Sequence, residues 1–391
     1  MGAGPVSRAA GIGQRAAGSG QREWVLGWES RLLLVLAAGL VVFGLASVYA
    51  ASSVLVERGR VLGSVRVLDQ LAGAAVGGLL LIGAARINLE KVRQLAWPIV
   101  LVTMGLLLIL VLPGTGFIAP RINGARRWLN IGISIQVSEI AKIAVVIWTA
   151  MLCARKGPEL KRMSRGLLPV MVVVGPMALL TFLQPDLSTA VTLVALALIV
   201  LFSAGARLGH FILLGALAIP VLWSQIEKVQ YQLLRLTTFF DPGSARQGEL
   251  YQIDQSLIGI GSGGLLGKGF GQGQQKLGFL PYPYSDFIFS TIGEEWGFVG
   301  VVLLAAAYLT FVLFALRLAK QSGDPFRQYL GTGLAVMIGL DAFTHMAVGL
   351  GLVPTTGLVL PFISYGRSGL LTALVATGLI INLGTKRRQK L

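Results

Sequence analysis

Three acidic residues lie in or beside one apolar stretch, "SDFIFSTIGEEWGF". Asp286 comes directly before the apolar run, and Glu294 and Glu295 lie inside it. At a helical rise of roughly 1.5 Å per residue, the two glutamates would lie about 12 to 14 Å further along the same helix. At roughly 100° per residue, Glu294 is about 80° and Glu295 about 180° around the axis from Asp286. The three carboxylates are therefore not expected to form one site.

Asp286 has two possible roles at this position. A helix dipole favours an ionised carboxylate at the helix N-terminus, and there Asp286 would cap the helix or occupy its first turn. A carboxylate at an accessible helix end can also accept a proton as a general base. On the residue pattern alone, the capping role is favoured, and the two glutamates are expected to be buried and structural or to line a cavity.

Other charged residues also fall in apolar segments. Glu139 and Lys142 in "SEIAK" are spaced i, i+3 and are expected to pair on one helix face; a structural salt bridge and a substrate contact are both open. Asp186, beside Pro185, is predicted to N-cap the following helix. Asp341 and His345 are spaced i, i+4 and are predicted to hydrogen-bond across one helical turn.

The composition points to a membrane. The 391 residues are 54% hydrophobic and only 13% charged, with a mean hydropathy of +0.75, which leaves too little polar surface for an ordinary soluble protein. Cys153 is the one cysteine, so no disulfide within the chain and no multi-cysteine metal site can form. The two histidines are far apart in sequence, which disfavours a histidine metal centre.

A span needs roughly 20 apolar residues, and that length divides the chain into about ten candidate helices. They are expected near 32–54, 66–85, 95–112, 135–153, 167–183, 186–204, 208–224, 286–316, 327–352 and 358–383. A tight reversal is predicted at Pro185 between the fifth and sixth, since proline and short polar residues interrupt the apolar run. The fold class is therefore all-α integral membrane protein.

The loops set the expected orientation. Most Lys and Arg residues fall in segments that share one side if both termini are cytoplasmic. Most of the excess positive charge behind the net charge of +16 is therefore explained by membrane topology, and it gives no support to nucleic-acid binding. Residues 1–30 are predicted to be a disordered basic tail, 31–384 the membrane domain and 385–391 a basic C-terminus. The longest outer loop, 225–285, lies between helices 7 and 8.

Two features of the outer segments are distinctive. Residues 251–260 place apolar side chains at helical spacing and predict a short helix on the membrane surface. The glycines of "GIGSGGLLGKGFGQG" follow and predict a flexible hinge over an outward-facing cavity. Another outer segment carries Arg121, Arg126 and Arg127, where positive charge is usually sparse.

Four ordered segments resemble a known family. "SEIAK", "LQPDLSTA", "YQIDQSLIGIGSGGLLGKGFGQGQQKLGFLPYPYSDFIFSTIGEEWGF" and "GLVPTTGLVLPFISYGRSG" resemble signature segments of the SEDS proteins (shape, elongation, division and sporulation), the FtsW/RodA family. "IGEE" and "QSLIGIGSGG" are closer to FtsW than to RodA. The resemblance implies a ten-helix membrane fold and a peptidoglycan glycosyltransferase that polymerises lipid II. It also implies a class B penicillin-binding protein (a transpeptidase) and other divisome or elongasome membrane proteins as partners.

The resemblance also assigns residues. "SDFIF" matches the family's T-D-F-I-F, so the catalytic acid corresponds to Asp286. Supporting roles are expected for Glu139, Lys142, Asp186, Glu294, Ser364 and Tyr365. Four positions depart from the family pattern: Tyr284 stands where a histidine is usual, Arg367 and Ser188 where a glycine is usual, and Val137 where a proline is usual.

The implied reaction gives the remaining cations a possible role. A carboxylate near the outer surface can take the proton of an attacking sugar hydroxyl, and cations can stabilise the departing lipid pyrophosphate. Arg121, Arg126, Arg127, Lys268 and Lys276 are the candidate pyrophosphate contacts. Because an acid at a helix start tends to be a weak base, desolvation or a divalent cation such as Mg²⁺ or Mn²⁺ is expected to complete the site.

Two other classes of function stay open at this point. A lipid II flippase or proton-coupled transporter would use Glu294 and the Glu139–Lys142 pair as a relay within the membrane, with Asp286 as a helix cap. A non-catalytic membrane scaffold for cell-wall synthesis would need none of these residues for chemistry.

Overall fold

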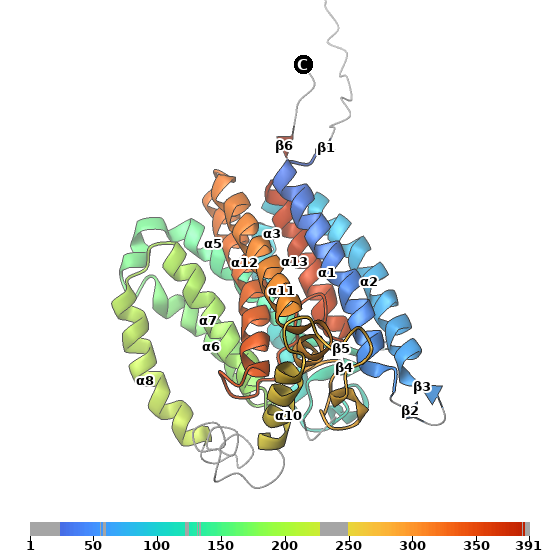
Figure 1. Cartoon of the computed structure of the whole chain (residues 1–391). Helices are drawn as coiled ribbons and strands as arrows, with labels where there is room; N and C mark the ends of the chain where they lie inside the picture. The colour runs from blue at the N-terminus through green and yellow to red at the C-terminus, as the bar shows by residue number, and fades with distance from the viewer. Residues whose placement is uncertain are drawn as a thin grey trace, which may run out of the picture.

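The protein is described by a computed structural model that is mostly helical (Figure 1). It describes residues 24–54, 56–57, 60–121, 125–130, 132, 134–226, 249–384 and 386–387. The helices are α1 (Trp28–Ser52), α2 (Leu62–Arg86), α3 (Leu89–Gln94), α4 (Ala96–Val111), α5 (Val137–Lys156), α6 (Leu167–Phe182), α7 (Leu187–Ser203), α8 (Leu208–Ile226), α10 (Glu249–Ser262), α11 (Ile288–Gln321), α12 (Pro325–Gly349) and α13 (Arg367–Leu383).

Strands form only three short antiparallel pairs in the described part of the chain. β1 (Trp24–Val25) pairs with β6 (Lys386–Arg387), so the two described ends of the chain lie together. The other pairs are β2 (Val56–Glu57) with β3 (Arg60–Val61), and β4 (Trp128–Asn130) with β5 (Ser134–Gln136). Both of these lie at the opposite end of the bundle from β1 and β6 (Figure 1).

The apolar helices follow the order expected from the sequence. Five are long and apolar enough to cross a membrane: those at Trp28–Ser52, Gly63–Arg86, Val137–Lys161, Ile288–Gln321 and Pro325–Gly349. Five shorter apolar helices lie at Ala96–Val111, Leu167–Phe182, Leu187–Ser203, Leu208–Leu217 and Arg367–Leu383. The chain is thus an all-α protein with several membrane-compatible helices.

Two predicted boundaries were wrong. α1 already begins at Trp28, so the last residues assigned to the tail are helical; the rest of that tail, 1–23, lies outside the described residues. The helix expected at 358–383 begins only at Arg367, because "PFISYG" turns twice before it and Gly366 takes a non-helical backbone conformation. That non-helical segment becomes part of the candidate site.

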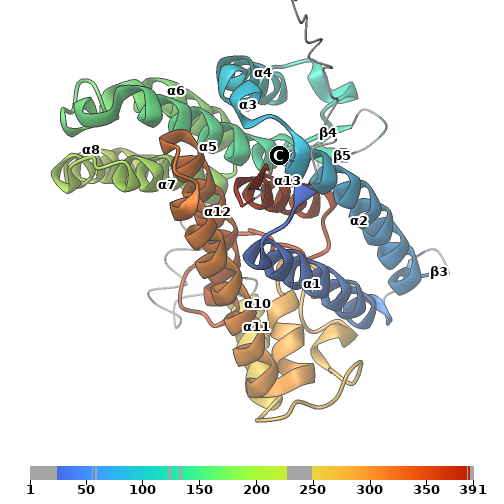
Figure 2. The same cartoon turned by 90° about the horizontal axis from the view of Figure 1, so that it is seen from above.

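α5 is the central helix. In its apolar stretch 83% of the residues are buried inside the protein, against 22–33% in the apolar stretches of α1, α2 and α11. α5 packs against α4, α7, α12 and α13. Viewed from above, α13 lies between α2 and α12, and α8 lies at the rim beside α6 and α7 (Figure 2). The buried charged residues of α5 therefore lie in the protein interior.

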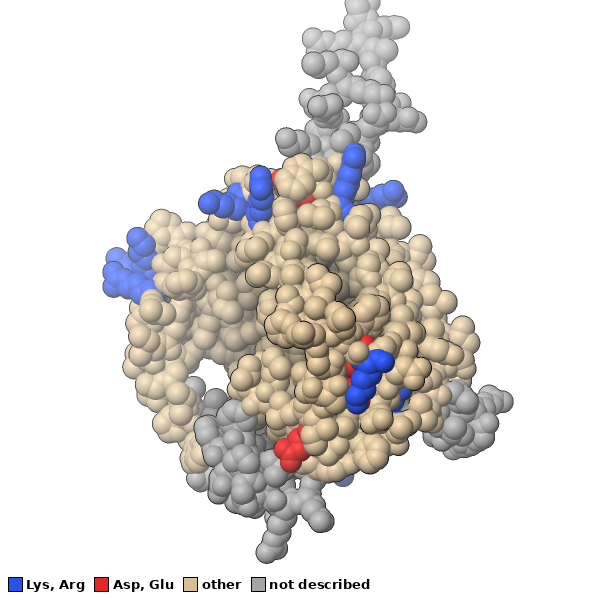
Figure 3. All heavy atoms as spheres, in the orientation of Figure 1, with Lys and Arg blue, Asp and Glu red and all other residues tan. Residues whose placement is uncertain are grey.

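Lys and Arg side chains gather at the end of the bundle that carries β1 and β6 (Figure 3). This is the end at which the sequence places the basic loops and tails. The distribution is the one that the positive-inside rule associates with a cytoplasmic face.

The reversal predicted at Pro185 is confirmed. α6 ends at Phe182 and α7 begins at Leu187. Asp186 is the N-cap of α7, and its Oδ1 accepts a hydrogen bond of 3.2 Å from the backbone N–H of Thr189. The predicted capping role of Asp186 is therefore confirmed.

The described part of the outer loop is well packed. α10 confirms the helix expected at 251–260 and packs against α11. Its Ser256 Oγ also donates to the carbonyl of Gly349, the last residue of α12, at 2.6 Å. Residues 227–248 of the predicted loop lie outside the described residues.

The glycine-rich segment after α10 serves close packing, which corrects the hinge interpretation. α11 breaks at Gly297, whose φ of 65° lies in the left-handed region. A Cβ on Gly267 would overlap the carbonyl of Glu295, and one on Gly263 would overlap the carbonyl of Gly293. The glycines therefore let the segment lie directly on the broken turn of α11.

Candidate active site

Asp286 lies in a turn just before α11. The helix begins at Ile288, and its N-cap is Phe287, which makes no side-chain cap. The prediction that Asp286 caps the helix or occupies its first turn was therefore wrong. Its side chain is partly buried and lies at the start of a short helical segment that ends at the Gly297 break.

The turn that carries Asp286 is fastened to the segment before α13. Ser364 Oγ donates to the carbonyl of Ser285 at 2.9 Å, and the backbone N–H of Tyr365 donates to the carbonyl of Tyr284 at 2.9 Å. Ser364 Oγ also accepts the backbone N–H of Leu360 at 2.9 Å. The expected supporting residues Ser364 and Tyr365 therefore fix the two residues that precede Asp286.

Polar residues of α2, which the sequence alone did not identify, form further hydrogen bonds to the segment before α13. Gln70 donates to the carbonyl of Ser364 at 3.0 Å and accepts the N–H of Gly366 at 3.2 Å. Asp69 accepts a hydrogen bond of 3.1 Å from the Tyr365 hydroxyl. Burial, reinforced by the Asp69 carboxylate, raises the pKa of Tyr365, so its phenol stays protonated and donates.

Arg66, also on α2, reaches the same aromatic pair. Its guanidinium carbon lies 3.5 Å from the ring centroid of Tyr284 and 5.8 Å from that of Tyr365. Stacking of this kind is a favourable cation–π arrangement. A signal for these α2 residues exists in the sequence, because Arg66, Asp69 and Gln70 are polar positions in an otherwise apolar helix.

The two glutamates of "IGEE" pair with the two lysines of the glycine-rich segment. Glu294 accepts from Lys268 Nζ at 2.8 Å and from the backbone N–H groups of Gln274 and Gln275 at 2.9 and 3.1 Å. Glu295 and Lys276 form a 2.8 Å ion pair in which both side chains are 2% exposed. In this arrangement both lysines neutralise glutamates, and their expected role at pyrophosphate stays a prediction.

The predicted Glu139–Lys142 pair is present and has a third member. Lys142 Nζ lies 2.8 Å from Glu139 Oε1 and 2.6 Å from Asp341 Oδ2, and its side chain is 1% exposed. The predicted hydrogen bond between Asp341 and His345 was wrong. His345 Nδ1 instead contacts the carbonyl of Leu358 at 2.7 Å, while Asp341 Oδ1 and His345 Nε2 have no hydrogen-bond partner among the described residues.

Arg126 and Arg127 bond to backbone carbonyls. Arg126 donates to Leu112 at 3.2 Å, and Arg127 donates to the carbonyls of Gln184 and Pro185. Arg121 is exposed. Their predicted role in binding pyrophosphate stays a prediction.

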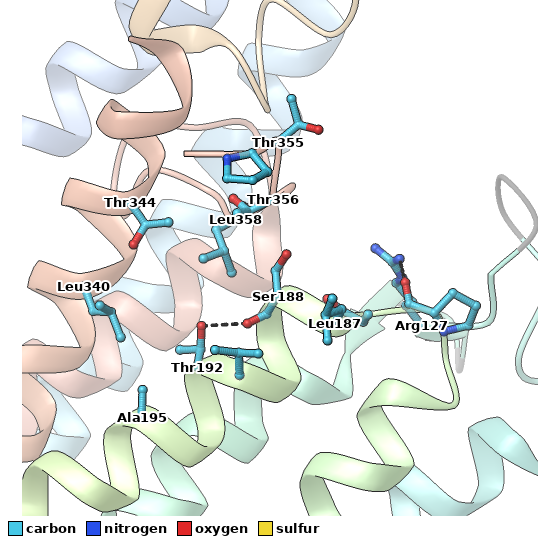
Figure 4. A pocket seen from close by; sticks show the side chains of 14 residues that line it. Arg127, Leu187, Ser188, Thr192, Ala195, Leu340, Thr344, Thr355, Thr356 and Leu358 are labelled. Carbon is cyan, nitrogen blue, oxygen red and sulfur yellow. Dashed lines mark hydrogen bonds between the residues drawn. The ribbon is translucent and has the colours of Figure 1, made fainter. Parts of the chain in front are cut away.

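Arg127 also lines a pocket of about 310 Å³ between α7, α12 and the loop that follows α12. Ser188, Thr192 and Ala195 of α7 face Leu340 and Thr344 of α12 across it, and Arg127 lies to one side (Figure 4). Asp286 is not among the lining residues. Asp186 lines the pocket, which brings it together with Arg127.

A protein-held metal centre has no obvious location among the described residues. No group of three or more His, Cys, Asp or Glu side chains there could hold a metal ion. A divalent cation at Asp286 would therefore need ligands from substrate or water as well as from the protein.

Fold and site together define a class: a polytopic α-helical membrane protein in which the acid Asp286 is held in a turn at the end of the bundle away from β1 and β6. The family model of the FtsW, RodA and SpoVE proteins, described as "Cell cycle protein", matches residues 30–389. The chain therefore belongs to the FtsW/RodA/SpoVE family, which confirms the resemblance seen in its four segments.

Curated relatives match over nearly their whole length. The chain is 38% identical over 356 residues to the "Probable peptidoglycan glycosyltransferase FtsW" of Geobacter sulfurreducens, covering 91% of this chain and 95% of the relative. It is 31% identical over 358 residues to the "Stage V sporulation protein E" of Bacillus subtilis, covering 91% and 97%.

Solved structures share the fold. A chain described under "Structural coordination of polymerization and crosslinking by a peptidoglycan synthase complex" aligns with a TM-score of 0.74 and 26% identity, over 92% of this chain and 98% of that one. The rod shape determining protein RodA of Thermus thermophilus aligns with a TM-score of 0.68 and 26% identity, over 94% and 99%.

Proposed function

We propose that the chain is a peptidoglycan glycosyltransferase that polymerises lipid II into glycan strands, with Asp286 as the general base. The observation that carries the assignment to Asp286 is that hydrogen bonds from Ser364 and Tyr365 hold its turn in place. The FtsW name of the similar curated proteins supports the activity and favours a role in cell division. Glu294 and Glu295 are less suited to the role because each is buried in an ion pair.

The reaction needs one proton acceptor and a stabilised leaving group. The 4-hydroxyl of an N-acetylglucosamine attacks the anomeric carbon of the donor, and its proton passes to a carboxylate oxygen of Asp286. The new glycosidic bond forms as the bond from the anomeric carbon to the pyrophosphate breaks, with inversion. The electron pair of that bond leaves with the lipid pyrophosphate, which cations stabilise.

The finer features of this assignment are part of the proposal. We place ten helices across the bacterial cytoplasmic membrane, with both termini in the cytoplasm and the turn of Asp286 at the outer face. The gathering of Lys and Arg at the β1–β6 end supports this orientation. A class B penicillin-binding protein is the proposed partner, and the similar chain from a peptidoglycan synthase complex supports it. Mg²⁺ or Mn²⁺ is the proposed cofactor at Asp286.

The test uses purified full-length protein with labelled lipid II, with and without its penicillin-binding partner and with Mg²⁺, Mn²⁺ or a chelator. Asp286→Asn is expected to abolish glycan strands. Asp324→Asn is the matched control, since Asp324 only caps α12, accepting the N–H of Arg327 at 3.0 Å, and asparagine caps equally well. Polymerisation undiminished by Asp286→Asn would remove Asp286 from the mechanism.

The same preparation separates the two alternatives. A transporter would move lipid II across vesicles and lose that activity in Glu294→Gln, with no glycan strands formed by the wild type. A scaffold would show neither activity, while the wild type would still bind its partner.

A further inference from the structure

Two arginines lie near Tyr365, next to the turn that carries Asp286. Arg66 on α2 stacks on Tyr284 and reaches Tyr365. Arg367 is the first residue of α13, and its Cγ lies 3.3 Å from the point where a Cβ on Gly73 of α2 would stand. Both side chains are partly buried. The pair therefore brings two guanidinium groups to the contact between α2 and α13.

Neither guanidinium forms an ion pair with a described residue. Within the described part of the chain, none of the ion pairs uses Arg66 or Arg367. Asp69, the nearest acid on α2, accepts the hydroxyl of Tyr365 instead. By contrast, Lys142, Lys268 and Lys276 each have a glutamate or aspartate within 2.8 Å. Partly buried cations without a counter-ion favour an anionic ligand.

The position of the pair suits a leaving group. Tyr284, on which Arg66 stacks, is two residues before Asp286, so their Cα atoms are no more than about 7.6 Å apart at 3.8 Å per residue. In an inverting transfer, the base and the leaving group act on opposite faces of one sugar ring. A ring placed between Asp286 and the arginines would meet that requirement.

We propose that Arg66 and Arg367 bind the pyrophosphate of the lipid-linked donor beside Asp286. This deepens the proposed function and rests on it. The guanidinium fork pairs two donors with phosphate oxygens, and stacking on Tyr284 holds the Arg66 fork in place. Tyr284 and Arg367 are two of the positions at which this sequence departs from the family pattern, so these two members of the pyrophosphate site are particular to this chain.

Binding is measured in the Asp286→Asn background, so that chemistry cannot consume the ligand. The probe is undecaprenyl pyrophosphate added to the detergent-solubilised full chain, with affinity read by native mass spectrometry. Arg66→Gln and Arg367→Gly are each expected to weaken binding about tenfold, the effect of losing a hydrogen bond to a charged group. Arg66→Lys is expected to recover part of the affinity, because lysine keeps the charge but not the fork.

Two controls make the result specific. Lys320→Gln removes one exposed positive charge at the far end of α11 and is expected to leave affinity unchanged. Phosphatidylglycerol is added as a competitor, because a general lipid-headgroup site would bind its phosphate equally. Size-exclusion elution at the wild-type position verifies that each variant is folded.

The outcomes separate this inference from the proposed function. Wild-type affinity in both Arg66→Gln and Arg367→Gly overturns the inference even if polymerisation is observed in the parent protein. Equal displacement by phosphatidylglycerol overturns the pyrophosphate assignment. Arginine-dependent binding in a chain that forms no glycan strands supports the inference while refuting the proposed activity.

Discussion

Removing Lys276 is expected to destabilise the protein more than removing Lys268. The carboxylate of Glu295 has Lys276 as its one hydrogen-bonding partner among the described residues, and both side chains are 2% exposed. Glu294 keeps two backbone N–H donors when Lys268 is lost. Lys268 is 28% exposed, so water already weakens its pairing. The two lysine-to-methionine substitutions therefore test the ion pairs of two adjacent acids, Glu294 and Glu295.

The expected losses of stability depend on the hydrogen-bond donors that each glutamate keeps after its lysine is replaced. Lys276→Met leaves a buried carboxylate without a partner, which costs about 3–5 kcal/mol. Lys268→Met removes one hydrogen bond to a charged group, and such bonds are worth about 1.5–3 kcal/mol. The loss should be smaller here because Lys268 is partly exposed to water. Replacing the whole pair in Lys276→Met/Glu295→Leu removes the unpaired charge and is expected to recover most of the loss.

Cys153 provides the assay. It is the only cysteine of the chain, and it is buried on α5, so a thiol-reactive dye reports unfolding. Lys276→Met is expected to melt several degrees below Lys268→Met, and the double variant is expected to melt above Lys276→Met. If Lys268→Met melts at or below Lys276→Met, or if the double variant shows no recovery, the charge-pairing argument is refuted.

Two further substitutions test the parts that position Asp286. Gly267→Ala is expected to abolish glycan synthesis and lower the melting temperature, because the φ of 81° at Gly267 disfavours a side chain and a Cβ there would overlap the carbonyl of Glu295. Gly261→Ala is the control: no atom lies within 4 Å of the added Cβ, so both assays should be unchanged. Ser364→Ala is expected to lower kcat about tenfold with little change in KM, since the lost hydrogen bonds position the base but do not touch substrate; an unchanged kcat would contradict this.

Most of the helical framework could be predicted because it depends on local pattern. Apolar length located the membrane-compatible helices, and the Pro185–Asp186 pair marked both the reversal and the cap. The i, i+3 spacing of Glu139 and Lys142 predicted their pairing, but not Asp341, which is 199 residues from Lys142. Spacing along one helix also misassigned Asp341 to His345, because a buried lysine on another helix was the stronger partner.

The site itself depends on contacts that no local pattern contains. Asp286 was expected at a helix end because an acid before an apolar run is a common cap. Instead α11 begins two residues later. The turn that contains Asp286 is held by the segment before α13, through a hydrogen bond between residues 79 positions apart in the chain. That segment was predicted to belong to the last helix, since apolar residues lie on both sides of the short polar run "SYGRSG". Only the packing of α2, through Gln70 and Asp69, shows why "ISYG" stays non-helical there: its backbone and hydroxyl groups are already hydrogen-bonded to α2 and to the turn of Asp286. Asp286 is therefore positioned by residues from three distant parts of the chain, and a substitution in any of them should alter the placement of the carboxylate without touching it.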